Sequence, residues 1–569
     1  MTLFLAAPPP APVHNTWAAP GLATGFTVVI AAAVFALVRS ARGRIRNPTD
    51  YLLAGRNVDA RQNALALVGS AIMYTTAIII AGHIALNGFD GVLLLTAFTI
   101  STILAVLVYA GPVRNVGGYT LGDLWELRAR QRPARIASAV VSLTVYTMFM
   151  IFTLATLALV ASRMFSTSST VDKPLVASVV AVVGLLTVLW VYAGGMVGLT
   201  RVLVLKVVLV IGMVAVLAVA VLAKYDMNPF HMLDAAEAHA APNKHGHDLL
   251  GPGRLLGKGG TAHSDQDPWV HMSKLISVAM GAMGMPFLFM RHFTAVNGRE
   301  ARRSAGWASM IIVAFYFCMT ILGLGAVAIL GGKNIGLLPE HRDITLPKLA
   351  DELGGKWATG MLGAVGLLSV AAIFGVQIIS AVTSFTKDIN AARGRQPEPA
   401  DELKQIRRNV LVIGLGYLVV GMAMLTQRTH IMVPTSIDLG AAVVLPAVVY
   451  SLFWRRFNTA GLLWTVYGGM AVTFFMVVFS NGVSGDVAAL FPDSDFKFID
   501  FEPGMVTGPL GFLLGFVGTL TSSERNDRAF KEIRVRALTG AVPPAQKKDL
   551  TVVGPEQRDR DSRTPSEAR

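Results

Sequence analysis

Long apolar runs separated by short polar segments make up most of the chain between residues 22 and 522. About 20 consecutive apolar residues suffice for a helix to cross the hydrocarbon core of a bilayer. The pattern therefore predicts an all-α polytopic membrane protein with about thirteen transmembrane helices. The predicted spans are 22–41, 64–87, 91–113, 136–163, 175–194, 198–224, 272–295, 305–332, 356–386, 407–426, 431–454, 459–480 and 506–522.

Basic side chains gather in the segments that follow odd-numbered spans. Examples are Arg42 after the first span, Arg128 and Arg135 after the third, and Arg291 and Arg299 after the seventh. The segments after even-numbered spans are short, acidic or rich in histidine. Because basic loops stay in the cytoplasm, the pattern predicts a multi-pass protein of the cell (plasma) membrane, with its N-terminus outside and its C-terminus cytoplasmic.

Composition narrows the function classes. The chain is 53% hydrophobic and 15% charged, and a soluble domain could not bury that much apolar surface. The basic loops account for the net charge of +14, so it does not indicate nucleic-acid binding. A single cysteine, Cys318, excludes an internal disulfide. The sequence contains no nucleophile–base pair, phosphate-binding loop or heavy-metal motif, so we expect neither an enzyme nor a primary pump.

The segments outside the predicted core are assigned by composition. Residues 1–21 are predicted to be an extracellular segment without the features of a cleaved signal peptide, and residues 22–46 a first helix with its inner loop. Residues 457–522 are predicted to form two additional helices, and residues 523–569 a disordered cytoplasmic tail. The core, 47–456, contains a long outer loop at 225–270, whose histidines fit no defined set of metal ligands and indicate a solvated loop: His231, His239, His245, His247 and His263.

The predicted span 272–295 carries Gly281, Gly284 and Pro286 in its middle, and each of them weakens helical hydrogen bonding. An unpaired backbone group in hydrocarbon costs several kcal/mol, so such a break persists only where it is buried in protein or lines a wet cavity. Broken helices of this kind form substrate sites in secondary transporters. The alternative is that these residues only permit close packing or a kink.

Spans two to six and spans seven to eleven form two blocks of five helices each. The blocks begin with the spans 64–87 and 272–295. An odd number of helices in a block makes the second block inverted relative to the first, as in one class of transporters. The first helix of the first block has polar and small residues in its middle, from Gly69 to Thr76. These residues either satisfy backbone groups freed by a second break or pack against neighbouring helices.

Five segments, in order, resemble the sodium:solute symporter family. They are NPTDYLLAGRNVDARQNALAL (47–67), GPVRNVGGYTLGDLWELRAR (111–130), VYAGGMVGLTRVLVLKVVL (191–209), GMPFLFMRHFTAVNGREARRSAGW (284–307) and SLFWRRFNTAGLLWTVYGGM (451–470). The fourth is similar to the cation/acetate (monocarboxylate) permease branch of that family.

This resemblance implies a LeuT-like core of five plus five helices in an inverted repeat, with one helix before it and two after it. It also implies import of a small monocarboxylate (acetate, propionate or a pyruvate-like acid), coupled to sodium or protons. The implied partners are the acid, the coupling cation and the lipid bilayer, with no nucleic acid. The alternatives are a symporter of the same fold for another small solute, such as proline or a sugar, and a transport-impaired sensor or paralogue.

Members of this family bind a sodium ion, and the resemblance implies that its backbone carbonyl ligands here are Gly69, Ile72 and Ser369. It also implies two hydroxyl ligands, and these fall at Ala372 and Ile373, whose side chains cannot bind a cation. No cofactor is expected apart from this possible sodium ion. A proton is the alternative coupling ion, because ionisable residues inside membranes are functional candidates.

The proton-coupling candidates are His83 and Lys206. Each has a simpler interpretation. His83 would be an interfacial histidine wetted by the outer headgroups, and Lys206 would extend its ammonium to the inner interface.

We expect the monocarboxylate to bind between the breaks at 69–76 and 281–286, where helix N-termini favour an anion. Its alkyl end would face Met283, Met285 and Phe287. Gln377 would donate a hydrogen bond to it or join two helices instead. The full set of predicted substrate-binding residues is Thr75, Thr76, Gly281, Gly284, Met285, Pro286 and Gln377.

Overall fold

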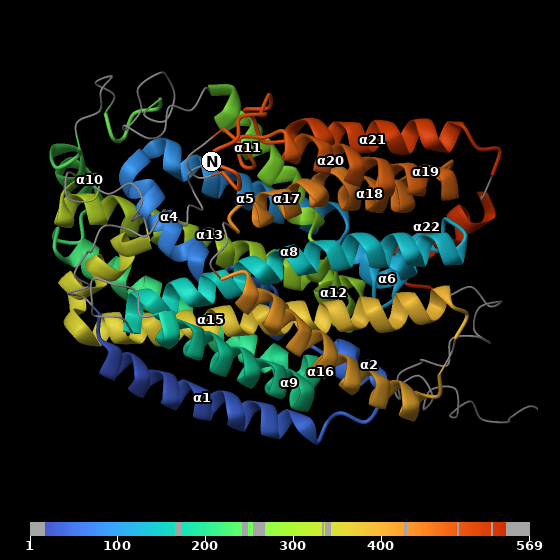
Figure 1. Cartoon of the computed structure of the whole chain (residues 1–569), viewed down its shortest axis with the longest axis horizontal. Coiled ribbons are helices and arrows are strands. Elements are labelled where there is room, and N and C mark those ends of the chain that lie inside the picture. Colours follow the sequence, from blue (N-terminus) through green and yellow to red (C-terminus); the bar gives the residue numbers. More distant parts are fainter. Residues whose placement is uncertain are drawn as a thin grey trace, which may run out of the picture.

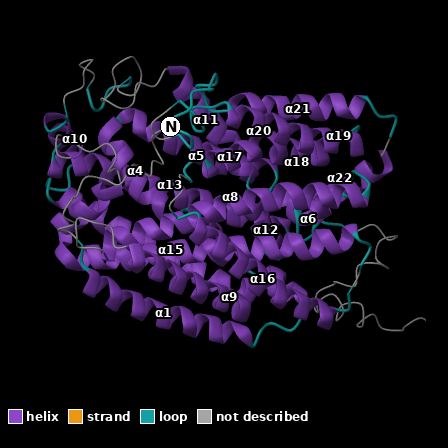
Figure 2. Ribbon diagram, viewed as in Figure 1, coloured by secondary structure: helices purple, strands orange, loops and turns teal. Residues whose placement is uncertain are grey.

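The structure, a computed structural model, describes residues 18–165, 173–241, 248–253, 268–332, 335, 343–395, 397–425, 429–485, 489–524 and 527–541. Within these ranges the ribbon consists of helices and connecting loops (Figure 2). The predicted all-α architecture is therefore confirmed.

The helices follow one another along the chain with short connections. In order they are α1 (Pro20–Arg42), α2 (Pro48–Leu53), η2 (Ala54–Arg56), α3 (Ala60–Ala71), α4 (Tyr74–Asn87), α5 (Phe89–Val108), α6 (Ala110–Val116), α7 (Leu121–Trp125), α8 (Gln131–Phe165), α9 (Lys173–Ala223), α10 (Pro229–Ala238), α11 (Pro268–Gly281), η3 (Ala282–Gly284), α12 (Pro286–Phe293), α13 (Gly298–Leu330), α15 (Thr345–Ala392), α16 (Pro399–Ala423), α17 (Met432–Leu439), η5 (Gly440–Val444), α18 (Leu445–Phe453), α19 (Thr459–Leu463), η6 (Trp464–Gly468), α20 (Gly469–Val478), α21 (Gly504–Leu520) and α22 (Asp527–Thr539).

Every predicted span has a helical counterpart. Ten helices in the described ranges are long and apolar enough to cross a membrane, and two shorter apolar helices, Ala77–Asn87 and Gly504–Leu520, match further predicted spans. The 51-residue α9 contains both the fifth and the sixth span, because Gly195 interrupts it with φ +48°. An added Cβ at Gly195 would lie 2.7 Å from the Tyr51 carbonyl oxygen, so this bend requires glycine.

α15 lies at the centre of the molecule, packed against α8 and α9, with α1 on the outside (Figure 1). The most apolar stretch of α15 is buried throughout, whereas α1 is exposed along most of its length. Large apolar side chains such as Val216, Phe317 and Val419 point outward. An exposed apolar surface of this kind fits a lipid environment, which confirms a multi-pass membrane protein.

Two of the spans are broken near their middle. α3 ends at Ala71, and Ile72 and Met73 are extended before α4 begins. In the seventh span α11 continues into the 3₁₀ turn η3, Met285 is extended, and Pro286 is the first residue of α12. The break predicted from Gly281, Gly284 and Pro286 is thus confirmed, and a matching break occurs in the second span.

The prediction of a disordered tail from residue 523 is wrong for residues 527–539, which form α22. Phe530, Ile533 and Ala537 recur along one face of this helix and are buried. Asn115 Nδ2 donates to the Ala537 carbonyl at 2.9 Å, which docks α22 on α6. Residues 542–569, like residues 1–17 at the other end, lie outside the described part of the chain.

Candidate functional site

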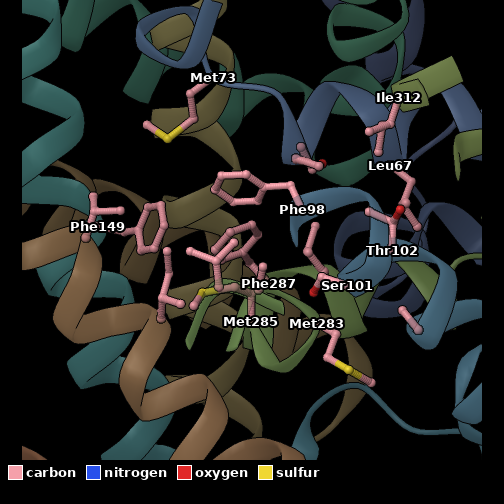
Figure 3. A pocket seen from close by; sticks show the side chains of 18 of the residues that line it. Leu67, Met73, Phe98, Ser101, Thr102, Phe149, Met283, Met285, Phe287 and Ile312 are labelled. Atoms are coloured by element: carbon pink, nitrogen blue, oxygen red, sulfur yellow. The ribbon is translucent and has the colours of Figure 1, made fainter. Parts of the chain in front are cut away.

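A cavity of about 160 Å³ lies beside the two breaks. Its walls come from α3, α5, α8, η3, α12 and α13, and Met73, Phe98, Phe149, Met283, Met285 and Phe287 surround it (Figure 3). It is smaller than the roughly 300–1,000 Å³ of pockets that hold drug-sized ligands. The cavity therefore suits a small solute with an apolar part.

Polar side chains also line this cavity, among them the charged Lys274 and Glu502, and some polar atoms have no hydrogen-bond partner among the described residues. The Tyr109 hydroxyl donates to the Met283 carbonyl at the second break, and its ring stacks on Phe289 with centroids 4.4 Å apart. Among the described residues, Ser101 Oγ and His292 Nδ1 are buried without a hydrogen-bond partner. Because buried polar atoms are nearly always hydrogen-bonded, these two atoms are candidates for contact with a solute or water.

Lys206 extends from α9 to the break between α3 and α4. Its Nζ donates to the carbonyls of Gly69, at 2.7 Å, and Ile72, at 2.6 Å. Gly69 lies in the last turn of α3 and Ile72 directly follows the helix, where carbonyl groups lack intrahelical partners. The side chain is 1% exposed, and no described carboxylate lies within ion-pair distance of it. The interpretation that Lys206 extends to the inner interface is therefore wrong.

Arg291 is a second buried cation beside the same turn of α3. It lies in α12, 1% exposed, and not in a loop as its place in a basic cluster suggested. Its Nε donates to Ser70 Oγ at 3.2 Å and its Nη1 to Thr200 Oγ1 at 2.9 Å. Its Nη2 is buried with no hydrogen-bond partner among the described residues. One signal in the sequence could have located this residue in a helix: it follows Pro286, a residue that commonly starts helices, by little more than one turn.

The substrate residues predicted at the second break fall into two groups. Met285 lines the cavity, whereas Gly281 and Gly284 face α17 and η5. An added Cβ would lie 2.1 Å from the Ile437 carbonyl oxygen at Gly281 and 2.3 Å from that of Gly440 at Gly284. These glycines therefore permit close helix packing, which was the alternative interpretation of the break, and Pro286 begins α12.

The other predicted substrate residues lie on α4 and α15. The side chains of Thr75 and Thr76 are outside the described part of the structure. Gln377 Nε2 donates to Thr153 Oγ1 at 2.7 Å and so joins α15 to α8. Its Oε1 is buried without a partner among the described residues.

The residues predicted to bind the coupling ion are only partly brought together. Gly69 and Ile72 hold the Lys206 ammonium, while the buried Ser369 hydroxyl has no hydrogen-bond partner in the described chain. His83 is buried in α4, where its Nδ1 lies 2.9 Å from Asn87 Nδ2, and it does not line the cavity.

The histidine-rich loop was the other place considered for a metal. The described residues contain no group of three or more side chains that could hold a metal ion. His245, His247 and His263 lie outside the described residues.

A third buried cation, Arg135 of α8, has a different environment. It pairs with Asp123 at 2.8 Å, Glu126 at 2.7 Å and Asp388 at 3.1 Å. Burial raises the pKa of Asp123, but the Arg135 guanidinium and the backbone N–H groups of Tyr119 and Thr120 outweigh it and leave that pKa below its ordinary value. The cluster joins α7 to α8 and α15.

Comparison with known proteins agrees with this architecture. The chain is 32% identical over 503 residues to a monocarboxylic acid transporter of Corynebacterium glutamicum, which covers 86% of this chain and 90% of the relative. It is 27% identical over 501 residues to the uncharacterized symporter YwcA of Bacillus subtilis, covering 87% and 94%.

Among solved structures, a Na⁺-coupled sialic acid symporter in its substrate-bound outward-open state superposes with a TM-score of 0.70. The two share 14% identity, over 89% of this chain and 98% of the other. This likeness supports the fold, and with it the predicted LeuT-like core. The model of the sodium:solute symporter family matches residues 51–469, and the chain therefore belongs to the sodium:solute symporter family.

Proposed function

We propose that this protein is a proton-coupled symporter that imports a small monocarboxylate, such as acetate, propionate or a pyruvate-like acid, across the cell membrane. The observation that carries the proposal is the Lys206 ammonium on the carbonyls of Gly69 and Ile72. The substrate class is supported by the similarity to a monocarboxylic acid transporter.

The oxygen atoms at the first break suit an ammonium group better than a sodium ion. Two carbonyls that a sodium ion would need already accept hydrogen bonds from Lys206. Ala372 and Ile373 offer hydrocarbon where hydroxyl ligands would be required, and Ile373 lines the cavity. A lysine amine supplies a positive charge at this position and loses it when it releases a proton, so the cycle needs no second cation.

The cavity provides the complementary features for the acid. Met283, Met285 and Phe287 form an apolar wall for a short alkyl chain (Figure 3). Ser101 offers a hydroxyl with no described partner. In the proposed cycle, proton and acid bind from one side, and rocking of the helices around the breaks exposes them to the other.

We also propose the orientation in which the N-terminus is outside and the C-terminus is cytoplasmic. The basic segments after odd-numbered spans support it. In that orientation α22 lies on the cytoplasmic side.

The test is uptake of labelled propionate into proteoliposomes that contain the full chain. Three conditions are compared: an imposed proton gradient with alkaline interior, an imposed sodium gradient, and no gradient. We expect uptake faster than in protein-free liposomes, which undissociated propionic acid enters unaided, with the proton gradient alone. Accumulation that requires sodium would overturn proton coupling, and no uptake under any gradient would overturn the transport function.

A further inference from the structure

We infer that Arg291, with the hydroxyls of Ser70 and Thr200, forms an anion subsite just beyond the cavity wall that takes the carboxylate of the transported acid. The inference rests on the proposed function, because it assigns the carboxylate-binding group of that same site.

The first step is the incomplete hydrogen bonding of Arg291. A guanidinium has five N–H donors in a planar fork, and this fork matches the two oxygens of a carboxylate. The described contacts use Nε on Ser70 and Nη1 on Thr200, both neutral hydroxyls, and leave Nη2 buried without a partner. The guanidinium therefore still has donor capacity for an anionic acceptor.

The second step is the uncompensated charge. Buried charges in proteins are normally paired, because an isolated charge in a low dielectric is costly. Lys206 donates to Gly69 and Ile72, and Arg291 donates to Ser70, so two buried cations bracket one turn of α3. Neither cation has a carboxylate within ion-pair distance in the described part of the chain. An anion bound at Arg291 would relieve this excess.

The third step is the position of the guanidinium relative to the cavity. Ser70 and His292 both line the cavity, and Arg291 lies immediately behind Ser70. Ser70 Oγ also donates to the Ala66 carbonyl at 2.8 Å, so it accepts the hydrogen bond from Arg291. A solute in the cavity would reach the guanidinium once α3 and α12 separate at Ser70, which is the movement expected at two broken helices.

The subsite also explains how acid and proton would be coupled. A carboxylate on Arg291 favours the charged form of Lys206, and by linkage the charged Lys206 favours the carboxylate. The other titratable side chains that line the cavity are His292, Tyr109, Tyr316, Lys274 and Glu502. His292 and Tyr109 contact each other at 5.6 Å between ring centroids. Acid binding should therefore tighten as the pH falls.

The experiment measures equilibrium binding of labelled propionate to the purified full chain, with unlabelled propionamide as a neutral competitor. The variants are Arg291→Gln, Arg291→Lys and Thr200→Val. The matched control is Arg201→Gln, since Arg201 follows Thr200 on α9 but donates to Ser40 at the surface. We expect Arg291→Gln to raise the Kd of propionate about tenfold or more and the control to stay within about twofold.

The preference for propionate over propionamide separates binding from a structural role. Loss of a charged partner reduces this preference, whereas general loosening of the cavity weakens both ligands alike. If Arg291→Gln does not fold, as judged by size-exclusion elution, Arg291→Lys and Thr200→Val decide, each with an expected loss of about threefold or more.

Unchanged propionate affinity and preference in the folded Arg291 and Thr200 variants would overturn the subsite. Absence of proton-driven uptake by the wild-type protein would instead overturn the proposed function.

Discussion

Two regions of the molecule bury positive charge in opposite ways. Around Arg135, three carboxylates surround one guanidinium, so its positive charge is paired within the fold. Around the break in the second span, the hydrogen bonds that Lys206 and Arg291 donate within the described chain go to carbonyl and hydroxyl oxygens. The first arrangement is complete without a ligand and joins helices. The second is electrostatically incomplete, which suits a site where protons and anions come and go.

The largest effect is expected from removing the titratable cation at the first break. Lys206→Met keeps an unbranched apolar stem but cannot carry a proton, so proton-driven propionate accumulation should fall about 100-fold. Uptake into proteoliposomes under an imposed proton gradient measures it. Lys224→Met, at a partly exposed residue directly after α9, is the control and should transport normally. Normal accumulation by Lys206→Met would remove the distinction between the two regions.

Removing Arg135, the cation that is paired with carboxylates, should lower stability instead. Arg135→Gln leaves the fully buried Asp388 without its charged partner, and breaking a buried pair costs up to about 3–5 kcal/mol. We expect a clear drop in the melting temperature of the purified protein. The protein that remains folded should still respond to the proton gradient. A variant that melts like wild type but has lost proton coupling would reverse the roles of the two regions.

A smaller effect is expected at the break in the seventh span, where the neutral Tyr109 hydroxyl donates a hydrogen bond to the backbone. Tyr109→Phe removes the hydroxyl that donates to the Met283 carbonyl while keeping the ring stacked on Phe289. The apparent KM for propionate should rise about threefold to tenfold, because one buried carbonyl loses its partner. The pH dependence of uptake should not change. A shifted pH profile would show that titration is not confined to the Lys206 region.

The smallest effect concerns how the stability of the Arg135 cluster depends on pH. Because the folded-state pKa of Asp123 is lowered, its charge stabilises the fold above the unfolded-state pKa of about 3.9, and that stabilisation is lost as pH falls through the folded-state pKa. Asp123→Asn should therefore melt several degrees below wild type at pH 7, and the gap should narrow below about pH 4. Melting curves at the two pH values test it. A gap that does not change with pH would contradict the assigned charge.

Hydropathy and helix-breaking residues were enough to predict the spans and the second break. Both signals are local: about 20 apolar residues in a row must cross a bilayer, and Pro286 cannot continue the hydrogen bonding of α11. The break in the second span was harder to place. It falls at Ile72 and Met73, two ordinary apolar residues, and is compatible with the fold because Lys206 satisfies the carbonyls it frees.

The residues that the sequence assigned wrongly are those whose surroundings come from distant elements. Arg291 and Arg135 were counted as loop residues, since charge alone does not show that a helix continues and is covered by neighbours. The sequence placed Lys206 in the sixth span, but only the packing of α9 on α3 shows which way its side chain points. α22 was missed because its apolar face is short and surrounded by charges.

One consequence of the contacts of Lys206 concerns the source of the positive charge at the first break. A sodium ion must be captured from the medium in every cycle, and its occupancy follows its concentration there. The ammonium of Lys206 is covalently tethered to α9, so its local concentration is fixed by the fold. Under the proposed coupling, only the proton is exchanged with the surroundings. The transporter would then work equally well in salt-poor and salt-rich water. The proton gradient across the membrane, and no sodium gradient, would drive it.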